Sequence, residues 1–454
     1  MQADQIFTNA TIVADVERGE VIQNGFIALT GDRISAFGSM ADAGTWLERS
    51  EQTTDVPWAL ILPGLVNAHT HLAAPIFRGL LDEGVMGRGL YDIAFPMEQL
   101  LEPDDIYWLG MLGCIEVLRA GCTTVNDIYY YADRLADAVD EIGVRAVLAE
   151  KVFDAELPRV GRGDYRRSAE RRRRKLKANL ELIERRHGSA DGRIRCLIGT
   201  HATDTCSEEL LREAMAQAEQ LGVGLHIHVA QSPTEMKYIE ETQGCTPVEY
   251  LDRLGLLGSR TLAIHCSNNS DSDIDRMAET GTRYACCPTI YPRRGRFPRL
   301  WEFLQRGVVT GFGTDWIRMD PWEGMRNALA AVRTLTSDPE ALPARELLSL
   351  HTMGSARVLG LEQDIGSLEA GKKADLILID LQRPHIQPFY STLPGVIYTV
   401  YPSDVHTVIV DGRTVIEGGK VVTVDEREVI DEVKARIPRY RSWLATTRTR
   451  QGSA

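Results

Sequence analysis

Cysteine is scarce in this sequence: the 454 residues include eight, with no CxxC pair and no zinc-finger spacing. So dilute a set excludes a disulfide-stabilised scaffold, because such scaffolds concentrate cysteine in short secreted chains. The adjacent Cys286 and Cys287 are expected in a buried strand. The pattern predicts free thiols and a reducing, cytoplasmic compartment.

Long apolar runs are also missing. The most apolar stretch, residues 59–66, is short and is interrupted by Pro63 and Gly64. A membrane-spanning helix needs about 20 predominantly apolar residues, so no membrane partner is expected. The first residues, MQADQIFTNATIVADVERGEV, hold early acidic side chains and lack the apolar core of a secretory signal. We therefore expect no targeting segment.

The chain has no excess of basic residues, since 51 Lys and Arg oppose 64 Asp and Glu for a formal net charge of −13. Nucleic-acid backbones are bound mainly by Lys and Arg, so no nucleic-acid partner is expected. One basic run stands out, YRRSAERRRRKLKANLELIERRHG at residues 165–188. It is either an anion- or RNA-binding patch or a solvated helix face, and the acidic total favours the helix face.

What is present is an ordinary globular balance, with 44% hydrophobic and 25% charged residues. A chain of 454 residues exceeds one ordinary domain, which predicts a large barrel or two to three domains. Residues 1–61 and 361–454 alternate short apolar runs with Gly, Asn and Asp turns, a pattern typical of strands. We expect these two segments to form one composite β-sandwich domain with a C-terminal helix, beside a domain of residues 62–360.

The middle segment alternates short strand-like runs with longer helical patterns such as SEELLREAMAQAEQLG. Eight strand–helix units in about 300 residues predict a (β/α)8 TIM-like barrel. A doubly wound open sheet is the alternative, but it would place no special chemistry at every strand end. The predicted strands are Leu62–Leu72, Thr123–Tyr129, Arg145–Phe153, Ile194–Ala202, Gly224–Gln231, Thr261–Ser267, Thr282–Pro288 and Val308–Trp316.

Histidine and aspartate recur at the carboxyl ends of these strands, where barrel enzymes place their active sites. Side chains alternate along a strand, so His69 and His71 point to one face and toward one point of the barrel mouth. His228 and Asp315 add an imidazole and a carboxylate from two further strands. Three histidines and one aspartate suit Zn2+, with one position left for water, and iron or manganese stays an alternative.

Five motifs stand in an order found in one known superfamily: LPGLVNAHTHL, HIHVAQ, AIHC, GFGTD and GSLEAGKKADLIL. From Ile12 to about Val422, the chain resembles the amidohydrolase superfamily. It is most similar to the branch of S-adenosylhomocysteine and methylthioadenosine deaminases, cytosine and guanine deaminases, and triazine hydrolases. The resemblance implies a metal-dependent hydrolase of small nitrogenous compounds that forms a homodimer or a higher homo-oligomer.

The same resemblance implies a role for each histidine. His265 would stand beside the metal and polarise the substrate, and Asp315 would also take a proton from the attacking water. His201, in GTHATDTCS, would lie near the substrate, whereas His226 would be a supporting inward-facing group. The implied ligands of a single divalent ion are His69, His71, His228 and Asp315.

The chain departs from the deaminase pattern at the fifth strand. Deaminases of this branch read HxxE there, and the Glu protonates a ring nitrogen, but this chain has Gln231. An amide cannot donate and recover a proton as a carboxylic acid does. Deamination therefore competes with urea, amide or halide hydrolysis, and Glu235 cannot be placed near the metal from the sequence. A non-catalytic ligand binder is a remote third alternative, because all four implied ligands are present.

Three loops supply candidate substrate contacts. Trp316 would narrow or cap the mouth, or pack at the barrel rim. Arg293 and Arg294, in the loop CPTIYPRRGRFPRLWEF, could bind an anionic substrate group, although a solvated loop is favoured.

The loop after the first strand, residues 77–96, is the usual place for a substrate lid in this branch. Arg78, Tyr91 and Phe95 are its candidate wall residues. Lys151 follows the third strand, whereas binuclear relatives carry a carboxylated lysine on the fourth. A single metal ion is therefore expected.

Overall fold

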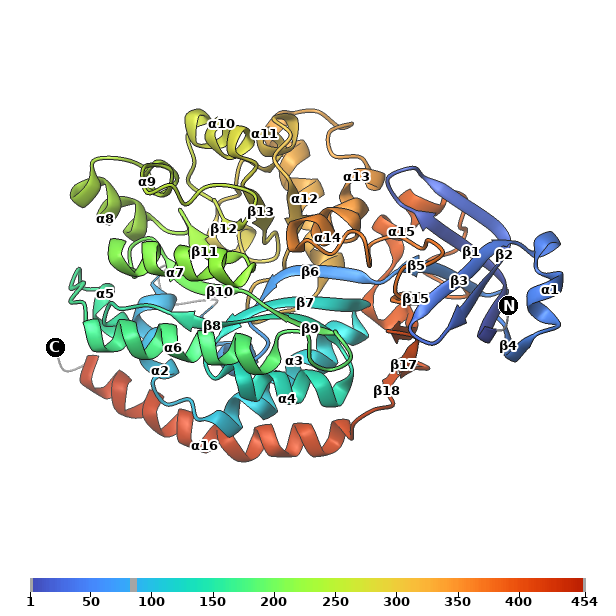
Figure 1. Cartoon of the computed structure of the whole chain (residues 1–454), viewed down its shortest axis with the longest axis horizontal. Helices are drawn as coiled ribbons and strands as arrows, with labels where there is room; N and C mark the ends of the chain where they lie inside the picture. The colour runs from blue at the N-terminus through green and yellow to red at the C-terminus, as the bar shows by residue number, and fades with distance from the viewer. Residues whose placement is uncertain (1–2, 82–87, 452–454) are drawn as a thin grey trace.

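The structure is a computed structural model that describes residues 3–81 and 88–451 of the chain. A strand-and-helix barrel forms the larger body, and a β-sheet built from both ends of the chain lies beside it (Figure 1). Residues 82–87, inside the predicted lid, lie outside the described residues.

Parallel strands form the barrel in the order in which they occur along the chain. Within the described residues, eight of them pair from β6 through β14, and the backbone bridge between Thr70 and Asp315 joins the first to the last. The predicted (β/α)8 barrel is therefore confirmed. Its strands are β6 (Leu65–Thr70), β7 (Cys122–Tyr129), β8 (Arg145–Val152), β9 (Ile194–Cys196) with β10 (Ile198–Ala202) in one position, β11 (Leu225–Val229), β12 (Thr261–His265), β13 (Arg283–Cys286) and β14 (Thr310–Phe312).

Helices cover the outside of the barrel, and their sequences explain why they form. Helix α7 begins after Ser207, whose hydroxyl accepts from the Leu210 amide, and ends at Gly222 in the left-handed conformation. The principal helices are α3 (Pro103–Arg119), α4 (Ala132–Ile142), α6 (Ala169–Arg186), α7 (Glu208–Leu221), α8 (Pro233–Gln243), α9 (Pro247–Arg253), α10 (Asp271–Thr280), α11 (Leu300–Gln305), α12 (Pro321–Thr336), α13 (Ala344–Ser349) and α14 (Met353–Leu359). Short helices α1 (Gly44–Leu47), α2 (Phe95–Glu98) and α5 (Leu157–Val160) and helix α15 (Thr392–Thr399) lie in the connections.

The two ends of the chain meet in one nine-stranded sheet of the described residues, in the order β18-β17-β16-β15-β5-β1-β2-β3 with β4 on β1. The predicted boundary after residue 61 falls inside β5, because residues 62 and 63 pair with β15 in this sheet. The strands are β1 (Ala3–Asp15), β2 (Glu20–Thr30), β3 (Arg33–Ser39), β4 (Ser50–Asp55), β5 (Ala59–Pro63), β15 (Leu376–Asp380), β16 (Val405–Val410), β17 (Arg413–Glu417) and β18 (Lys420–Val421).

The passage from the sheet to the barrel depends on one glycine. Gly64 separates β5 from β6, and a Cβ atom there would lie 2.2 Å from the Thr123 hydroxyl oxygen. Buried ion pairs stabilise the junction: the Arg145 guanidinium on β8 binds Asp375, just before β15, at 2.8 Å and Asp411, between β16 and β17, at 2.7 Å. Strand β6, which carries His69 and leads into His71, therefore starts from a rigid support.

The C-terminal helix α16 (Glu426–Gln451) lies with the barrel rather than with the terminal sheet, to which the sequence had assigned it. The helix packs along α3 and is seen at the lower edge of the molecule in Figure 1. The Tyr440 hydroxyl donates to Asp105 Oδ2 at 2.8 Å, and Arg439 pairs with the same carboxylate. These side chains tie α16 to the barrel helices.

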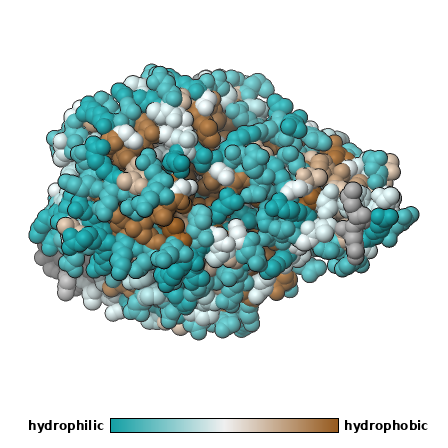
Figure 2. Space-filling view, viewed as in Figure 1, coloured by the Kyte–Doolittle hydropathy of each residue, from teal (hydrophilic) through white to brown (hydrophobic). Residues whose placement is uncertain are grey.

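Polar side chains dominate the face shown in Figure 2, and apolar residues gather in its hollows. The basic run forms α6, whose cations pair with acidic neighbours: Arg186 binds Asp133 at 2.8 Å and Lys175 binds Glu150 at 2.9 Å. Among the described helices, none is both long and apolar enough to cross a membrane.

Candidate metal centre and active site

The four predicted ligands converge at the carboxyl ends of the barrel strands. Ring nitrogens of His69, His71 and His228 lie within 4.8 Å of one another. One carboxylate oxygen of Asp315 lies 3.5 Å from Nε2 of both His69 and His71. The geometry follows from the fold, because His69 lies on β6, His71 directly follows that strand, His228 lies on β11, and Asp315 follows β14.

Backbone carbonyls orient two of these imidazoles. His71 Nδ1 lies 2.8 Å from the Ile128 carbonyl oxygen, and His228 Nδ1 lies 2.5 Å from that of His201. A carbonyl oxygen only accepts, so each ring donates from Nδ1 and keeps the lone pair of Nε2 for a metal.

His69 gives the clearest sign that the residues fit a metal ion. Its Nε2 is buried and has no hydrogen-bond partner among the described residues. A buried nitrogen without a partner is costly, by about 1–3 kcal/mol, and a cation would satisfy it. If Nε2 keeps its lone pair for a cation, Nδ1 carries the ring proton and donates to Nε2 of His226, which lies 3.0 Å away. Three imidazoles and one carboxylate are a donor set for zinc or a similar divalent ion.

Burial keeps these imidazoles in the form that binds metal. It lowers the pKa of His69 and His71 well below the ordinary value, and that of His228 to about 4. A neutral imidazole offers its lone pair without first releasing a proton. At neutral pH the three imidazoles are therefore uncharged and can bind a cation.

His265 faces the opposite side of the carboxylate. Its Nε2 lies 3.9 Å from Asp315 Oδ2, and its Nδ1 lies 2.9 Å from the Tyr291 hydroxyl oxygen. The backbone of His265 is in the left-handed region, with φ of +75°, and Asp315 has φ of +60°. Such conformations cost about 1–3 kcal/mol each and cluster at functional sites.

A cavity opens above the predicted ligands and is lined by four of the predicted substrate contacts. His201, Gln231, Arg294 and Trp316 line it, together with His265. The Arg294 guanidinium carbon lies 5.9 Å from the centre of the Trp316 ring, so the two side chains together form part of the wall.

Other predicted contacts lie elsewhere. Arg293 binds Glu323 at 3.5 Å and is not among the described residues that line the cavity. Arg78 faces a separate pocket beside α3. Tyr91 and Phe95 lie behind the wall, because the Tyr91 hydroxyl contacts Ser232 at 2.7 Å and the Phe95 ring packs on His201 at 5.5 Å between centroids.

The cavity also contains an ion pair that the sequence did not reveal. Lys151 Nζ lies 3.0 Å from Glu98 Oε2, and the hydroxyls of Tyr129 and Tyr130 each donate to Glu98 at 3.0 Å. Burial lowers the pKa of Lys151, while Glu98 acts in the opposite direction. Glu98 comes from the short helix α2, and no sequence motif marked it.

Glu235 supports Gln231 from behind the wall. Its carboxylate accepts from the backbone amides of Ala230 at 3.0 Å and Gln231 at 2.7 Å, and from the Thr203 hydroxyl at 2.5 Å. Burial raises the pKa of Glu235 to about 8. The described cavity lining includes Gln231 but not Glu235.

Comparison with known proteins identifies the family of this fold and site. The profile of the amidohydrolase family matches residues 60–415, well over half of the chain. The chain belongs to the amidohydrolase family.

Relatives of this amidohydrolase are similar along almost its whole length. It is 35% identical over 420 residues to the 5'-deoxyadenosine deaminase of Methanothermobacter thermautotrophicus, covering 91% of this chain and 94% of that protein. It is 36% identical over 427 residues to the 5-methylthioadenosine/S-adenosylhomocysteine deaminase of Moorella thermoacetica, covering 92% and 96%.

A solved structure agrees with the fold of the amidohydrolase. An adenosine deaminase from Xanthomonas campestris with bound zinc has a TM-score of 0.89 at 26% identity, covering 97% of this chain and 99% of that one. The family, the relatives and the ligand cluster together make this protein a metal-dependent hydrolase that acts on C–N bonds.

Replacing His226 by Gln is expected to weaken metal binding by about 10–100-fold, because the ring supports His69 Nδ1 from behind. Competition with a chromogenic chelator measures this affinity. His351→Gln is the matched control: His351 is equally buried, and its Nδ1 lies 3.2 Å from the Val66 carbonyl oxygen. Equal affinities for the two variants would contradict the supporting role.

Proposed function

We propose that this amidohydrolase removes the exocyclic amino group of an adenine nucleoside or a related aminoheterocycle by hydrolysis. The observation that carries the proposal is its similarity, over nine-tenths of the chain, to two deaminases of adenine nucleosides. The cavity supports it, since three of the predicted ligands, His71, His228 and Asp315, line the same space as the polar wall residues.

The proposed metal ligands are His69, His71, His228 and Asp315, with zinc as the ion, as in the adenosine deaminase of similar fold. A divalent ion held there supplies positive charge that lowers the pKa of a water molecule to about 7. Lys151 is paired with Glu98, which supports a single ion rather than a pair bridged by a modified lysine.

Asp315 is the proposed proton carrier. Its carboxylate accepts one proton from the attacking water and passes it to the leaving amine, so that an amino group departs as ammonia and hydroxyl takes its place. His265, across from Asp315 Oδ2, is placed to stabilise the charge that develops at the attacked carbon. His201 and Trp316 border the space for the heterocycle.

Gln231 favours a second candidate function. Gln231 occupies the position where related deaminases have a proton-donating Glu. The Gln231 amide can donate a hydrogen bond to a ring nitrogen but cannot transfer a proton to it. Reactions that need no ring protonation, such as urea or amide cleavage or halide displacement, therefore compete with deamination.

Product masses decide between the two functions. The metal-loaded protein is incubated with 5'-deoxyadenosine, methylthioadenosine, aminopyrimidines, chlorotriazines, ureas and amides. Exchange of amino for hydroxyl on an adenine nucleoside supports the proposal. Cleavage into two fragments, or loss of halide, with intact nucleosides would replace it by the second function.

Replacing Gln231 by Glu is expected to raise kcat/KM for adenine nucleosides on the order of 10²-fold, because the carboxylic acid can protonate the ring. Steady-state kinetics across pH measures the gain. Gln243→Glu, at the exposed end of α8, makes the same change away from the cavity and should leave the rate unchanged. A rate that stays the same or falls in Gln231→Glu would show that this position does not limit ring protonation.

We also propose a cytoplasmic protein that acts on small molecules as a homodimer or a higher homo-oligomer and binds neither nucleic acid nor membrane. The eight free cysteines support a reducing compartment. The acidic partners of the α6 cations support the exclusion of nucleic acid.

A further inference from the structure

The segment after β14 has a strained backbone and carries two residues of the cavity wall. Asp315 and Ile317 have φ of +60° and +76°, and a β-branched residue such as Ile317 rarely adopts the left-handed region. Strained backbone of this kind persists only where its surroundings hold it. The contacts of the segment therefore determine where the Asp315 carboxylate and the Trp316 ring lie.

One arginine–carboxylate pair binds this segment at two points. Arg78 Nε donates to the Ile317 carbonyl oxygen at 2.8 Å, and the same guanidinium pairs with Glu116 Oε2. The other oxygen of Glu116 accepts from the Met319 amide at 3.1 Å. The pair thus holds the backbone on both sides of Arg318.

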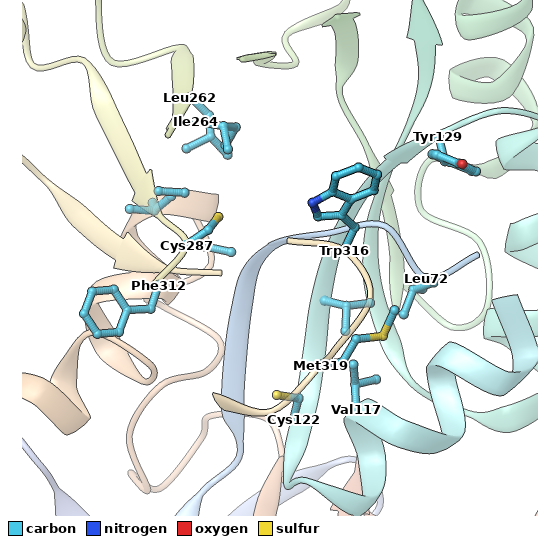
Figure 3. Close-up of a cluster of buried hydrophobic side chains, with 14 of the residues drawn as sticks. Leu72, Val117, Cys122, Tyr129, Leu262, Ile264, Cys287, Phe312, Trp316 and Met319 are labelled. Carbon is cyan, nitrogen blue, oxygen red and sulfur yellow. The ribbon is translucent and has the colours of Figure 1, made fainter. Parts of the chain in front are cut away.

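The pair also connects three elements around the metal ligands. Arg78 follows the short turn Ala74–Phe77 in the loop that leaves β6, and Glu116 lies on α3. The Met319 side chain is fully buried and packs near Leu72 and Val117, below Trp316 (Figure 3). The loop after β6, helix α3 and the segment after β14 are therefore held together at one place.

We propose that Arg78 and Glu116 are positioning residues for the hydrolytic reaction. By holding the Ile317 carbonyl and the Met319 amide, they keep segment 315–319 in the conformation that turns Asp315 toward the histidines. The role of Asp315 rests on the proposed function. A misplacement of a reacting group by about 1 Å costs on the order of 10² in rate, so release of the segment should be visible in kcat.

The first test combines hydrogen exchange with kinetics on Arg78→Gln and Arg78→Lys. In the metal-free protein, amides of residues 315–320 should exchange faster in Arg78→Gln, while those of α7 and the terminal sheet stay unchanged. In the metal-loaded enzyme, kcat should fall on the order of 10²-fold with a smaller change in KM. Arg78→Lys keeps the positive charge and a hydrogen-bond donor. It should therefore recover part of the kcat and part of the protection of residues 315–320 from exchange.

The matched control is Arg326→Gln. Arg326 donates to the Ile397 and Val400 carbonyl oxygens at 3.0 and 2.9 Å, so it also binds backbone through a guanidinium, but at α15. Its loss should speed exchange around α15 alone and leave kcat as in the wild type.

A double-mutant cycle tests whether the pair acts as a unit. Glu116→Gln alone should lower kcat, and the effects of Arg78→Gln and Glu116→Gln should be less than additive, because both release the same segment. Unchanged exchange at residues 315–320 in Arg78→Gln, or faster exchange throughout the barrel with a lower Tm, would overturn the positioning role. The exchange result decides this even if the wild-type protein deaminates nothing.

Discussion

Replacement of Asp315 by Asn is expected to lower kcat by about 10²–10⁴-fold, the usual contribution of a positioned proton acceptor. The amide keeps the shape of the side chain but cannot take a proton from water. The loss should persist at saturating metal, because Asp315 is the proposed proton carrier as well as a proposed ligand. Steady-state kinetics at several zinc concentrations separates the two effects.

Asp320→Asn is the control for this experiment. Asp320 caps α12 by accepting from the Glu323 amide at 3.0 Å, and Asn caps helices about as well as Asp. Normal activity is expected in this variant. If Asp315→Asn also turned over substrate at the wild-type rate, the assignment of the proton carrier would be wrong.

Removal of the metal is expected to abolish turnover and to lower thermal stability. Dialysis against a chelator, followed by calorimetry and assay, tests both effects. A ligand present at about 1,000 times its Kd stabilises the folded state by about 4 kcal/mol, so Tm should fall on removal and recover with zinc. The recovery distinguishes loss of the ion from irreversible unfolding.

His71→Ala provides the matched variant for metal removal. This imidazole faces Asp315 at 3.5 Å, so its loss leaves an incomplete ligand set. Chelator should then change Tm much less than in the wild type. Full activity of chelated wild-type protein, with metal content below detection, would contradict a metal-dependent reaction.

The barrel could be predicted because its signal is local. Each strand is a short apolar run of roughly the right length, and each run contains one barrel position of the structure. The proposed ligands at the strand ends follow from the same pattern, since the alternation expected along the first strand places His69 and His71 on one face, although β6 itself ends at Thr70. The barrel and the position of these histidines can both be inferred from where the strands lie along the chain.

Side chains that reach the site from loops could not be predicted in this way. Glu98 lines the cavity from the short helix α2, and Tyr291 contacts His265 from the loop after β13. Arg293 and Arg294 are neighbours in one 3-10 turn, yet only Arg294 is in the described cavity lining. Such differences depend on the loop backbone, which composition and periodicity do not specify.

The C-terminal helix shows the same limit at a larger scale. Its charged sequence predicts a helix but not its partner, and Asp105, the residue that binds Arg439 and Tyr440, lies far away in the chain. Long-range pairs of this kind are determined by tertiary packing. The helical structure of α16 was therefore predictable from its sequence, whereas its packing against α3 was not.

The most direct test of this account is the amount of divalent metal per chain in protein purified without chelator and exchanged into metal-free buffer. Elemental analysis of the wild type and of His71→Ala measures it. The account predicts one ion per wild-type chain, with zinc as the main element, and a large loss in the variant. No bound ion in catalytically active wild-type protein, or two ions per chain, would contradict it.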